Sequence, residues 1–329
     1  MESGWTMWCK NCFGSVDMRR DTKCATCNSP LHKECAIKED GASFCDVCYT
    51  VKEETKEKVN FEIPDVIRRT YIETYRTCPH KFFKEVIEGH TAPPTCYTQI
   101  GVDLHKLFEK AIHNRSYTRE NMEEEYQEIW NAYPDDLFES DKQREIMKAR
   151  VIESIDNFYH IIRDMPIPIM TEETIHYSIG EDLPKIEFTM DVVLEVDGEL
   201  EIVDWKTGKV MVGQKLSTDL QAPLYIYGVK KHFNKPVRKF TFYYVNENKE
   251  RVFERVNEDE YVCRVGKREY NISITDSIRE VKSIFSQIKK GNFNIPSDTR
   301  KMHFACKVCH LRQQGLCRGA DEEAWYTQY

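Results

Sequence analysis

Two aspartates and a lysine in the middle of the chain form a pattern suited to metal-assisted phosphate chemistry. Asp191 falls in one expected strand, Asp204 near the end of the next, and Lys206 follows two residues later. Because side chains alternate along a strand, Asp204 and Lys206 point to the same face. Two carboxylates can hold Mg²⁺ or Mn²⁺ and so activate water, while an ammonium group stabilises developing negative charge. The pattern favours hydrolysis of a phosphodiester bond.

Two further motifs flank this segment. Gly101-Val-Asp-Leu-His105 lies in an expected helix upstream, and Gln221-Ala-Pro-Leu-Tyr225 lies in an expected helix downstream. A histidine facing the two aspartates would add a nitrogen ligand to a metal site. Glu172 and Glu173, just before the first core strand, are additional candidates for a metal-binding carboxylate.

Each motif alone also has an ordinary structural explanation. Asp204 and Lys206 can form a surface ion pair, which contributes about 0–1 kcal/mol. His105 can bond to Glu109 one helical turn later. The glutamine and tyrosine of the downstream motif can simply cap and pack their helix. The functional interpretation therefore depends on finding all the motifs together.

The elements that must position these residues follow from hydrophobic periodicity. Helices are expected over residues 65–90, 98–113, 120–133, 140–163, 217–232 and 272–290, with Pro79 kinking the first or starting a new helix. Strands are expected over Ile175–Ile179, Ile186–Val196, Leu200–Trp205, Phe240–Asn246 and Arg251–Val256. Asp197-Gly198 between two of them is a strong hairpin signal. This order predicts an α/β fold with helices on both faces of the sheet.

Taken in order, these motifs resemble the RecB-like branch of the PD-(D/E)xK nuclease superfamily, which includes RecB and AddB nuclease domains and CRISPR-adaptation exonucleases. With the cysteines described below, the resemblance spans residues 78–317. It implies a restriction-endonuclease-like mixed sheet flanked by helices. It also implies that Mg²⁺ or Mn²⁺ is held by His105, Asp191, Asp204 and the backbone of Trp205. Lys206 would then assist the nucleophile, and Gln221 and Tyr225 would lie near the DNA.

Cysteines at the two ends of this region suggest a second metal centre. Cys78 precedes the core, and Cys306, Cys309 and Cys317 follow it. Four thiolates are the usual ligand set of a 4Fe–4S cluster. One distant cysteine with a C-terminal trio resembles the iron–sulfur staple of AddB-like and CRISPR-associated members. A four-cysteine zinc site, or no metal at all, is the alternative.

The first 50 residues carry four closely spaced ligand pairs, enough for two tetrahedral Zn²⁺ ions. So short a segment buries little core, so metal would supply its folding energy. The order of ligands resembles a PHD or RING-type cross-brace finger. That resemblance implies one zinc bound by Cys9, Cys12, His32 and Cys35 and another by Cys24, Cys27, Cys45 and Cys48. A structural or docking role is the simplest function of this finger. The alternative functions are contact with DNA ends, recognition of histone tails and ubiquitin chemistry.

Composition narrows the class of protein. The 13 cysteines are clustered, which in a cytosolic protein indicates metal sites rather than disulfides. The net charge of −8 gives no overall basic signature of nucleic-acid binding, but it does not exclude local basic patches. No apolar run approaches the roughly 20 residues of a membrane span, and the N-terminus does not read as a targeting peptide. We expect a cytoplasmic protein, or a nuclear one in a eukaryote, with no membrane association.

These observations predict a metal-dependent deoxyribonuclease, an exonuclease acting on single-stranded or frayed DNA ends. The expected domains are a zinc finger at 1–50, a linker at 51–62 and a nuclease domain at 63–329 with its iron–sulfur staple. The sequence has no Gly-x-x-x-x-Gly-Lys-Ser/Thr loop, so a helicase or another recombination or repair protein would act as a partner through the finger. The alternatives are a non-catalytic adaptor that binds DNA or protein through the finger, and a ubiquitin-ligase-like factor.

Overall fold

The computed structural model describes residues 7–9, 15–16, 21–39, 41–45, 48, 61–295 and 306–317. The chain divides into two compact units. One combines Met1–Ile63, Cys78–His90 and Ile288–Tyr329, and the other combines Pro64–Thr77 and Thr91–Gln287. The domain boundaries expected from the sequence, at residues 50 and 62, do not correspond to this division and stay a prediction. The second unit carries the large sheet and is described first.

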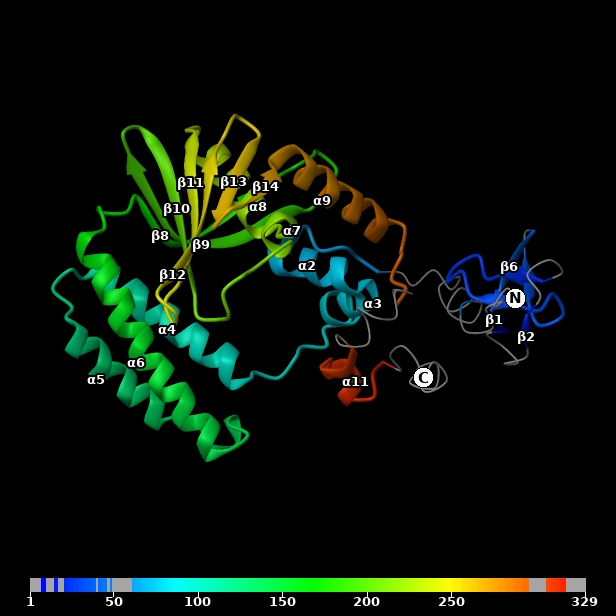
Figure 1. Cartoon of the computed structure of the whole chain (residues 1–329), viewed down its shortest axis with the longest axis horizontal. Helices are drawn as coiled ribbons and strands as arrows, with labels where there is room; N and C mark the ends of the chain where they lie inside the picture. The colour runs from blue at the N-terminus through cyan, green and yellow to red at the C-terminus, as the bar shows by residue number, and fades with distance from the viewer. Residues whose placement is uncertain are drawn as a thin grey trace. The chain divides into compact units, whose positions relative to one another are not determined.

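An eight-stranded mixed sheet forms the centre of the second unit (Figure 1). Its strands are β7 (Val66–Arg68), β8 (Met170–Tyr177), β9 (Lys185–Val196), β10 (Glu199–Lys206), β11 (Val237–Tyr244), β12 (Lys249–Arg255), β13 (Glu260–Val265) and β14 (Arg268–Ser273). They run in the order β14-β13-β12-β11-β10-β9-β7, with β8 also paired to β9. β10 is parallel to β11 and β7 to β9, whereas the other pairs are antiparallel. The predicted mixed, restriction-endonuclease-like α/β arrangement is therefore confirmed.

The β9–β10 hairpin fixes the position of the predicted catalytic strand. Its two-residue turn is Asp197-Gly198, with φ of 54° and 80°. Positive φ at both positions matches the right-handed twist of the flanking strands, and glycine and aspartate tolerate it better than most residues. The ladder then runs from Val196 opposite Glu199 to Val192 opposite Val203 without a slip. The turn thus sets the register of the two strands.

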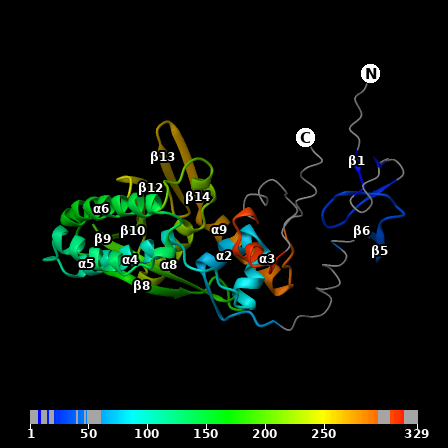
Figure 2. The ribbon, with the colours of Figure 1, turned by 90° about the horizontal axis from the view of Figure 1, so that it is seen from below.

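Helices cover both faces of the sheet. They are α2 (Arg69–Thr77), α4 (Cys96–His113), α5 (Arg119–Asn131), the 3₁₀ turn η2 (Asp135–Leu137), α6 (Asp141–Asp164), α7 (Lys215–Thr218), α8 (Gln221–Phe233) and α9 (Ile274–Lys289). Helices α4, α5 and α6 lie side by side (Figures 1 and 2). Phe108 of α4 stacks on Phe158 of α6 at 3.8 Å, and Trp205 of β10 meets Phe158 edge-on at 5.0 Å. These rings join the helical layer to the sheet.

Helix α8 packs against β9 through a glycine. A Cβ atom at Gly228 would lie 2.6 Å from Cζ of Phe188, whose ring is stacked on Tyr225 at 4.2 Å. Gly228→Ala should therefore lower the free energy of unfolding by about 1–3 kcal/mol, because the ring has little room to move. Urea unfolding followed by circular dichroism would measure the loss. Gly208→Ala is the matched control, since a Cβ there meets nothing within 4 Å. Equal stability of both variants would contradict this account of the packing.

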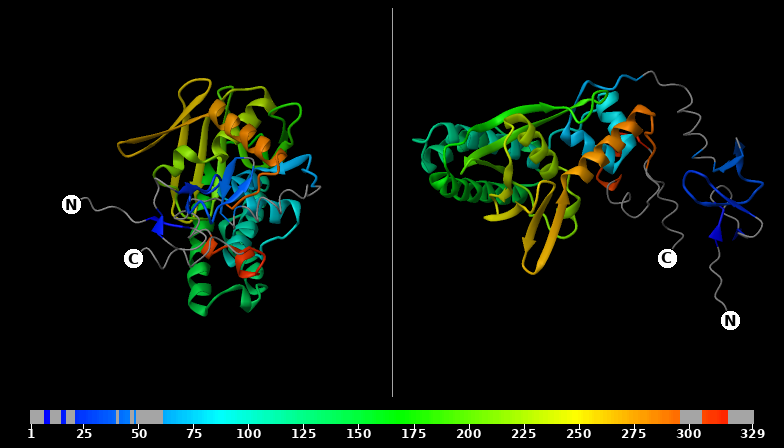
Figure 3. Two further views of the ribbon diagram at one scale, coloured as in Figure 1. Left: turned by 90° about the vertical axis from the view of Figure 1, so that its right-hand side faces the viewer. Right: turned by 90° about the horizontal axis from the view of Figure 1, so that it is seen from above.

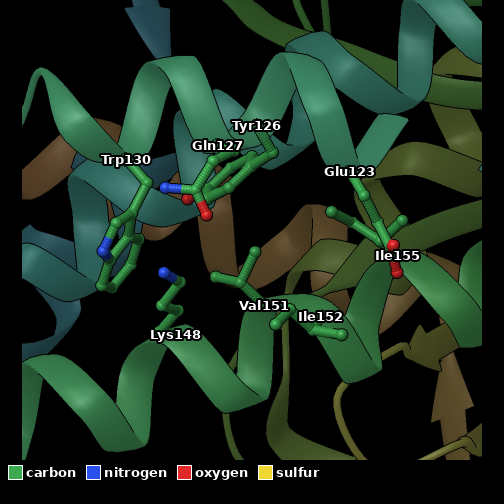
Figure 4. Close-up of a pocket in the computed structure, with 8 residues that line it drawn as sticks. All are labelled: Glu123, Tyr126, Gln127, Trp130, Lys148, Val151, Ile152 and Ile155. Atoms are coloured by element: carbon green, nitrogen blue, oxygen red, sulfur yellow. The ribbon is translucent and has the colours of Figure 1, made fainter. Parts of the chain in front are cut away.

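A shallow groove runs between α5 and α6 (Figure 4), with a volume of about 140 Å³. Trp130, Tyr126 and Gln127 line one wall and Val151 and Ile152 line the other. The groove lies in the helical layer and shares no residue with the predicted catalytic set.

The hairpin of β13 and β14 projects from the sheet (Figure 3). Neither of these strands nor β7 was expected from the sequence. No described helix has both the length and the apolar character needed to cross a bilayer.

In the first unit, the segment after α2 does not continue the expected helix over 65–90. Cys78 caps a new helix, α3 (Pro79–Phe82), which leads into the π-helix η1 (Phe83–Ile87). The expectation that Pro79 begins a new helix is confirmed, and proline suits this first position because it lacks an N–H group.

Aromatic and polar contacts join the later described segments of this unit. The ring of Phe293 lies 5.0 Å from Phe61 and 4.8 Å from Phe83. His310, at the start of α11 (His310–Gln313), lies 3.5 Å from a carboxylate oxygen of Glu85. The N-terminal part contains short pairs: β1 (Met7–Trp8) with β2 (Ser15–Val16), β3 (Thr22–Lys23) with β4 (Pro30–Leu31), and β5 (Ile37–Glu39) with β6 (Ala42–Phe44).

Candidate active site

Three carboxylates lie at the same level of three neighbouring strands. Glu172 of β8 is opposite Asp191 of β9, because the neighbouring pairs are Thr171 with Val192 and Glu173 with Met190. On the other edge of β9, the pair of Val192 with Val203 places the next residue, Asp204, opposite Asp191 as well. Like charges facing each other across a sheet destabilise it, so the arrangement favours a cation among them.

His105 of α4 completes this group. Its Nδ1 lies 3.4 Å from Oε1 of Glu172 and 3.4 Å from Oδ1 of Asp191. One ligand atom from each of these three residues falls within 4.8 Å of the others. Carboxylate oxygens with one imidazole nitrogen are suitable ligands for Mn²⁺ and, through the oxygens, for Mg²⁺. The donor set therefore fits a divalent cation.

The backbone conformation of Glu172 is unusual. Its φ is 49°, in the left-handed region that a β-strand residue other than glycine rarely enters. Strained backbone of this kind persists only where surrounding contacts enforce it, and it occurs often at functional sites. Here it coincides with the point where the carboxylate meets His105 and Asp191. Glu173, the other candidate, instead pairs with Met190 in the ladder.

Asp204 is fully enclosed and is bound by two side chains. Oδ1 accepts a hydrogen bond of 2.5 Å from Nε2 of Gln221, and Oδ2 lies 2.6 Å from Nζ of Lys206. Lys206 also donates to Oε1 of Gln221 at 2.8 Å. Asp219 accepts from the backbone N–H of Gln221 at 2.8 Å and so fixes the start of α8. Glutamine, lysine and aspartate thus form one closed network.

The structure brings the predicted residues together in two groups that share Asp191 as their neighbour. His105, Glu172 and Asp191 form one group of possible metal ligands, while Asp204 belongs to the network with lysine. The backbone of Trp205 links the two, since its N–H donates to Oδ2 of Asp191 at 2.6 Å. The sequence identified all of these positions but did not distinguish the two groups.

Gly101 explains how α4 approaches the end of β10. A Cβ atom at this position would lie 3.2 Å from Oγ1 of Thr207, directly after the catalytic strand. The absence of a side chain lets the helix come close enough for His105, one turn later, to reach β9. The glycine of this motif therefore has a packing role, and the histidine is the candidate metal ligand.

Tyr225 packs beside the site rather than within it. Its ring stacks on Phe188 at 4.2 Å with an interplanar angle of 17°, and only 6% of the residue is exposed. Burial, and then the nearby charge of Asp204, raise the pKa of its hydroxyl. The tyrosine is thus neutral at physiological pH.

Burial governs the protonation of Asp204. Removal from water raises the pKa of this carboxyl, while the ammonium of Lys206 acts in the opposite direction and Asp191 raises it further. Burial lowers the pKa of His105, but the charges and hydrogen bonds of Asp191 and Glu172 outweigh it and raise the pKa to about 10. In the absence of metal, a protonated imidazole thus supplies the positive charge that the pocket requires.

The raised pKa of His105 predicts a stability that depends on pH. Because the folded-state pKa of about 10 exceeds the ordinary 6.5, the imidazolium stabilises the fold fully below pH 6.5. This contribution is lost as the pH rises through about 10. Without added divalent cation, His105→Gln should therefore lose stability at acidic pH and match the wild type at high pH. Denaturant unfolding at several pH values would measure this.

The control for this prediction is His113→Gln on the same helix. His113 lies at the exposed end of α4, where Nδ1 contacts the carbonyl of Glu109. A constant difference between His105→Gln and the wild type at every pH would contradict the proposed charge interaction.

The N-terminal cysteines gather in two sets. Cys24, Cys27, Cys45 and Cys48 place their sulfur atoms within 4.8 Å of one another, and Cys9, His32 and Cys35 form a second group of this kind. The hydrogen bond from Cys45 is the largest of the effects that lower the pKa of Cys27 to about 4, which favours its thiolate form. Thiolate is the form that ligates metals. Cys12, the expected eighth ligand, lies outside the described residues.

The four C-terminal cluster candidates are arranged differently. Burial raises the pKa of Cys78 to about 11, and the charges of Cys306 and Cys317 add to this effect, which places these thiols near one another. The described sulfur atoms of the four do not gather within 4.8 Å as the N-terminal sets do. Zn–S bonds of about 2.3 Å in a tetrahedron put sulfurs about 3.8 Å apart.

Converging carboxylates with a histidine and a lysine at one level of a mixed sheet are residue types suited to metal-assisted phosphate hydrolysis. Residues 70–318 match the family model of the PD-(D/E)XK nuclease superfamily, and because this is most of the chain, the protein belongs to that superfamily. No curated protein matches the chain by sequence. Among solved structures, the chain is similar to a "Putative exonuclease" from Eubacterium rectale, with 11% identity and a TM-score of 0.46, over 87% of this chain and 98% of that one.

Proposed function

We propose that the protein is a RecB-like deoxyribonuclease that removes nucleotides from single-stranded or frayed DNA ends with Mg²⁺ or Mn²⁺. The observation that carries this is the convergence of Glu172, Asp191 and Asp204 on one level of the sheet, with His105 between two of them. Membership of the nuclease superfamily supports the reaction class. The resemblance to exonucleases of the RecB-like branch supports the preference for ends.

Each residue has a distinct part in this proposal. His105, Glu172 and Asp191 hold the cation, with Asp204 and the backbone of Trp205 completing its surroundings. When bound, the cation supplies a polarised water and neutralises charge on the phosphate. Lys206, kept in place by Gln221 and Asp204, donates a hydrogen bond to the nucleophile or to the oxygen that gains negative charge. Glu172 was a secondary candidate in the sequence, and its place opposite Asp191 supports including it in this set.

Digestion of labelled DNA tests the function directly. Linear single strands, linear duplexes and circular single strands are incubated with Mn²⁺, with and without EDTA. We expect EDTA-sensitive loss of linear single strands, with short products released from one labelled end, while circles persist. Cleavage of circles would indicate an endonuclease. No cleavage of any substrate with Mn²⁺ or Mg²⁺ would reject the nuclease proposal and favour a DNA- or protein-binding adaptor.

Two further metal centres belong to the same proposal. The N-terminal sets would bind two Zn²⁺ ions in a PHD- or RING-like finger, which would serve as the contact for a helicase or another repair protein. Cys78, Cys306, Cys309 and Cys317 would hold a 4Fe–4S cluster. Because burial raises the pKa of the Cys78 thiol, a ligating thiolate at this position would depend on the positive charge of a bound metal.

The iron–sulfur assignment predicts a coloured protein. Purified under nitrogen, the wild type should be brown with broad visible absorption and contain about four iron atoms per chain. Cys309→Ser should lose the colour and most of the iron, since one of the four ligands is removed. Cys263→Ser, a buried cysteine of β13 outside the set, is the control and should stay brown. A colourless wild type with an additional zinc ion at these cysteines would replace iron with zinc.

A further inference from the structure

Arg69, the first residue of α2, lies beside the carboxylates and belongs neither to the group of possible metal ligands nor to the network around Lys206. Its position follows from the ladders of β9. Along β9, residues 185–187 pair with β7, residues 186–193 pair with β8, and residues 192–196 pair with β10. The stretch paired with β8 thus overlaps both of the others. Because a strand has only two edges, β8 occupies one of them. β7 and β10 therefore lie end to end along the other.

The carboxyl ends of these two strands point toward each other. β7 runs parallel to β9, and β10 runs antiparallel to it. β7 ends at Arg68, opposite Glu187, and the chain enters α2 at Arg69. β10 ends at Lys206, two residues after Asp204. Arg69 therefore enters the same gap along β9 as the catalytic aspartate and lysine.

A cation–π contact holds the guanidinium in this gap. Cζ of Arg69 lies 5.9 Å from the centroid of the Tyr225 ring, which is itself stacked on Phe188. The pKa of Tyr225 is raised most by burial, but it also responds to Asp204 and to Arg69. Both charges are therefore near this ring. A guanidinium has five N–H donors, and a contact with an aromatic ring does not use them as a hydrogen-bonded carboxylate would.

Other residues anchor α2, so the Arg69 guanidinium is not needed for that purpose. Glu73 accepts a hydrogen bond of 3.2 Å from the backbone N–H of Leu220. Arg76 forms an ion pair of 2.8 Å with Glu280 and bonds to the carbonyl of Thr218. These contacts tie the helix to the start of α8 and to α9. The backbone of Arg69 is thus fixed independently of its side chain.

Arg69 has no close ion-pair partner in the described part of the chain, although its charge acts on Glu73 one helical turn later. No described carboxylate forms an ion pair with it, whereas the preceding residue, Arg68, is paired with Glu187 at 3.2 Å. A positive charge with free donors, fixed beside three carboxylates, suits an incoming polyanion. A phosphate accepts two parallel N–H bonds from the edge of a guanidinium.

We propose that Arg69 binds a backbone phosphate of the substrate strand, next to the phosphodiester that is hydrolysed. The inference rests on the proposed nuclease function and names an additional contact within it. The contact offsets repulsion between the strand and the carboxylates and positions the strand over them. Because it addresses phosphate and not a base, it does not depend on nucleotide sequence.

Binding and turnover of Arg69→Gln test the proposal. Fluorescence anisotropy of a labelled 20-nucleotide oligothymidine is measured with Ca²⁺ in place of Mn²⁺ at several salt concentrations. Losing one phosphate contact should weaken binding roughly tenfold and reduce the slope of log K against log salt by about 0.7. KM should rise by a similar factor with kcat nearly unchanged, because a phosphate that does not react is bound equally in substrate and transition state.

Two variants serve as controls. Arg68→Gln removes a neighbouring charge that is already paired and should bind like the wild type. Arg69→Lys should recover the salt slope but only part of the affinity, since lysine cannot donate in the same bidentate manner. Oligoadenosine should give the same losses as oligothymidine.

Several outcomes would overturn the inference. One is an Arg69→Gln variant with wild-type salt slope and KM, even if its unfolding midpoint falls, because that indicates a structural role only. Another is an equal loss in Arg68→Gln, which indicates a general effect of surface charge. A wild type that cleaves no DNA at all rejects the proposed function instead, whereas a cleaving wild type with an unaffected Arg69→Gln rejects only the phosphate contact.

Discussion

Asp204→Asn should abolish Mn²⁺-dependent cleavage while leaving the fold intact. The amide keeps an oxygen for Gln221 but removes the negative charge beside Asp191 and Lys206. We expect a fall in kcat/KM of at least about 1000-fold, or about 4 kcal/mol of transition-state stabilisation. The unfolding midpoint should not fall, because burial raises the pKa of Asp204 and so makes its ionised form costly in the folded protein at neutral pH.

Asp197→Asn is the matched control for this experiment. Asp197 lies in the turn of the same hairpin with its side chain 87% exposed, and asparagine tolerates its positive φ. This variant should retain wild-type activity and stability. Residual cleavage by Asp204→Asn within about tenfold of the wild type would show that the carboxylate is not required, and the proposed mechanism would have to be abandoned.

Cys24→Ser should unfold the N-terminal module. Removing one of four sulfur ligands should release one of the two expected Zn²⁺ ions, and structural zinc contributes about 10–16 kcal/mol to the folding of such modules. Among the described residues of this segment, the core that could replace the metal is small and consists of Leu31, Phe44 and buried cysteines. We expect bound zinc to fall by one ion per chain and residues 21–45 to become sensitive to protease.

Cys263→Ala should leave the zinc content unchanged, because this cysteine lies in β13 rather than in the N-terminal set. Nuclease activity on oligonucleotides should persist in Cys24→Ser, since His105 and the carboxylates lie in the other compact unit. Two zinc ions per chain in the Cys24→Ser variant would contradict the assignment of this ligand.

Local sequence signals predicted the core of the fold well. The Asp197-Gly198 turn and the apolar runs around it located β9 and β10, and the expected helix over 217–232 corresponds to α8. The β13–β14 hairpin escaped notice because β14 has a single buried residue, Ile272, and so lacks a hydrophobic pattern. β7 was read as helix because its strand form depends on pairing with β9, which the local sequence does not reveal.

The chemistry was predictable where residue types are unusual for their position. Asp191, Asp204 and Lys206 interrupt apolar strands, and a buried carboxylate without a purpose is costly. Glu172 was only a secondary candidate, because its importance depends on lying opposite Asp191 in the ladder. Nothing in the local sequence marks Arg69 as a functional residue, since an arginine at the start of a helix is common. Only the shared edge of β9 reveals its position.

The two-residue turn between β9 and β10 has a consequence for how this chain tolerates change in length. One inserted or deleted residue there shifts β10 by one position, and every side chain of that strand exchanges faces. A deletion would place Trp205, and an insertion Val203, where Asp204 meets Gln221, and an acid would enter the aromatic layer beneath. An insertion or deletion at Asp197-Gly198 should therefore disrupt both the catalytic network and the hydrophobic core. Changes in loop length should be better tolerated at other connections.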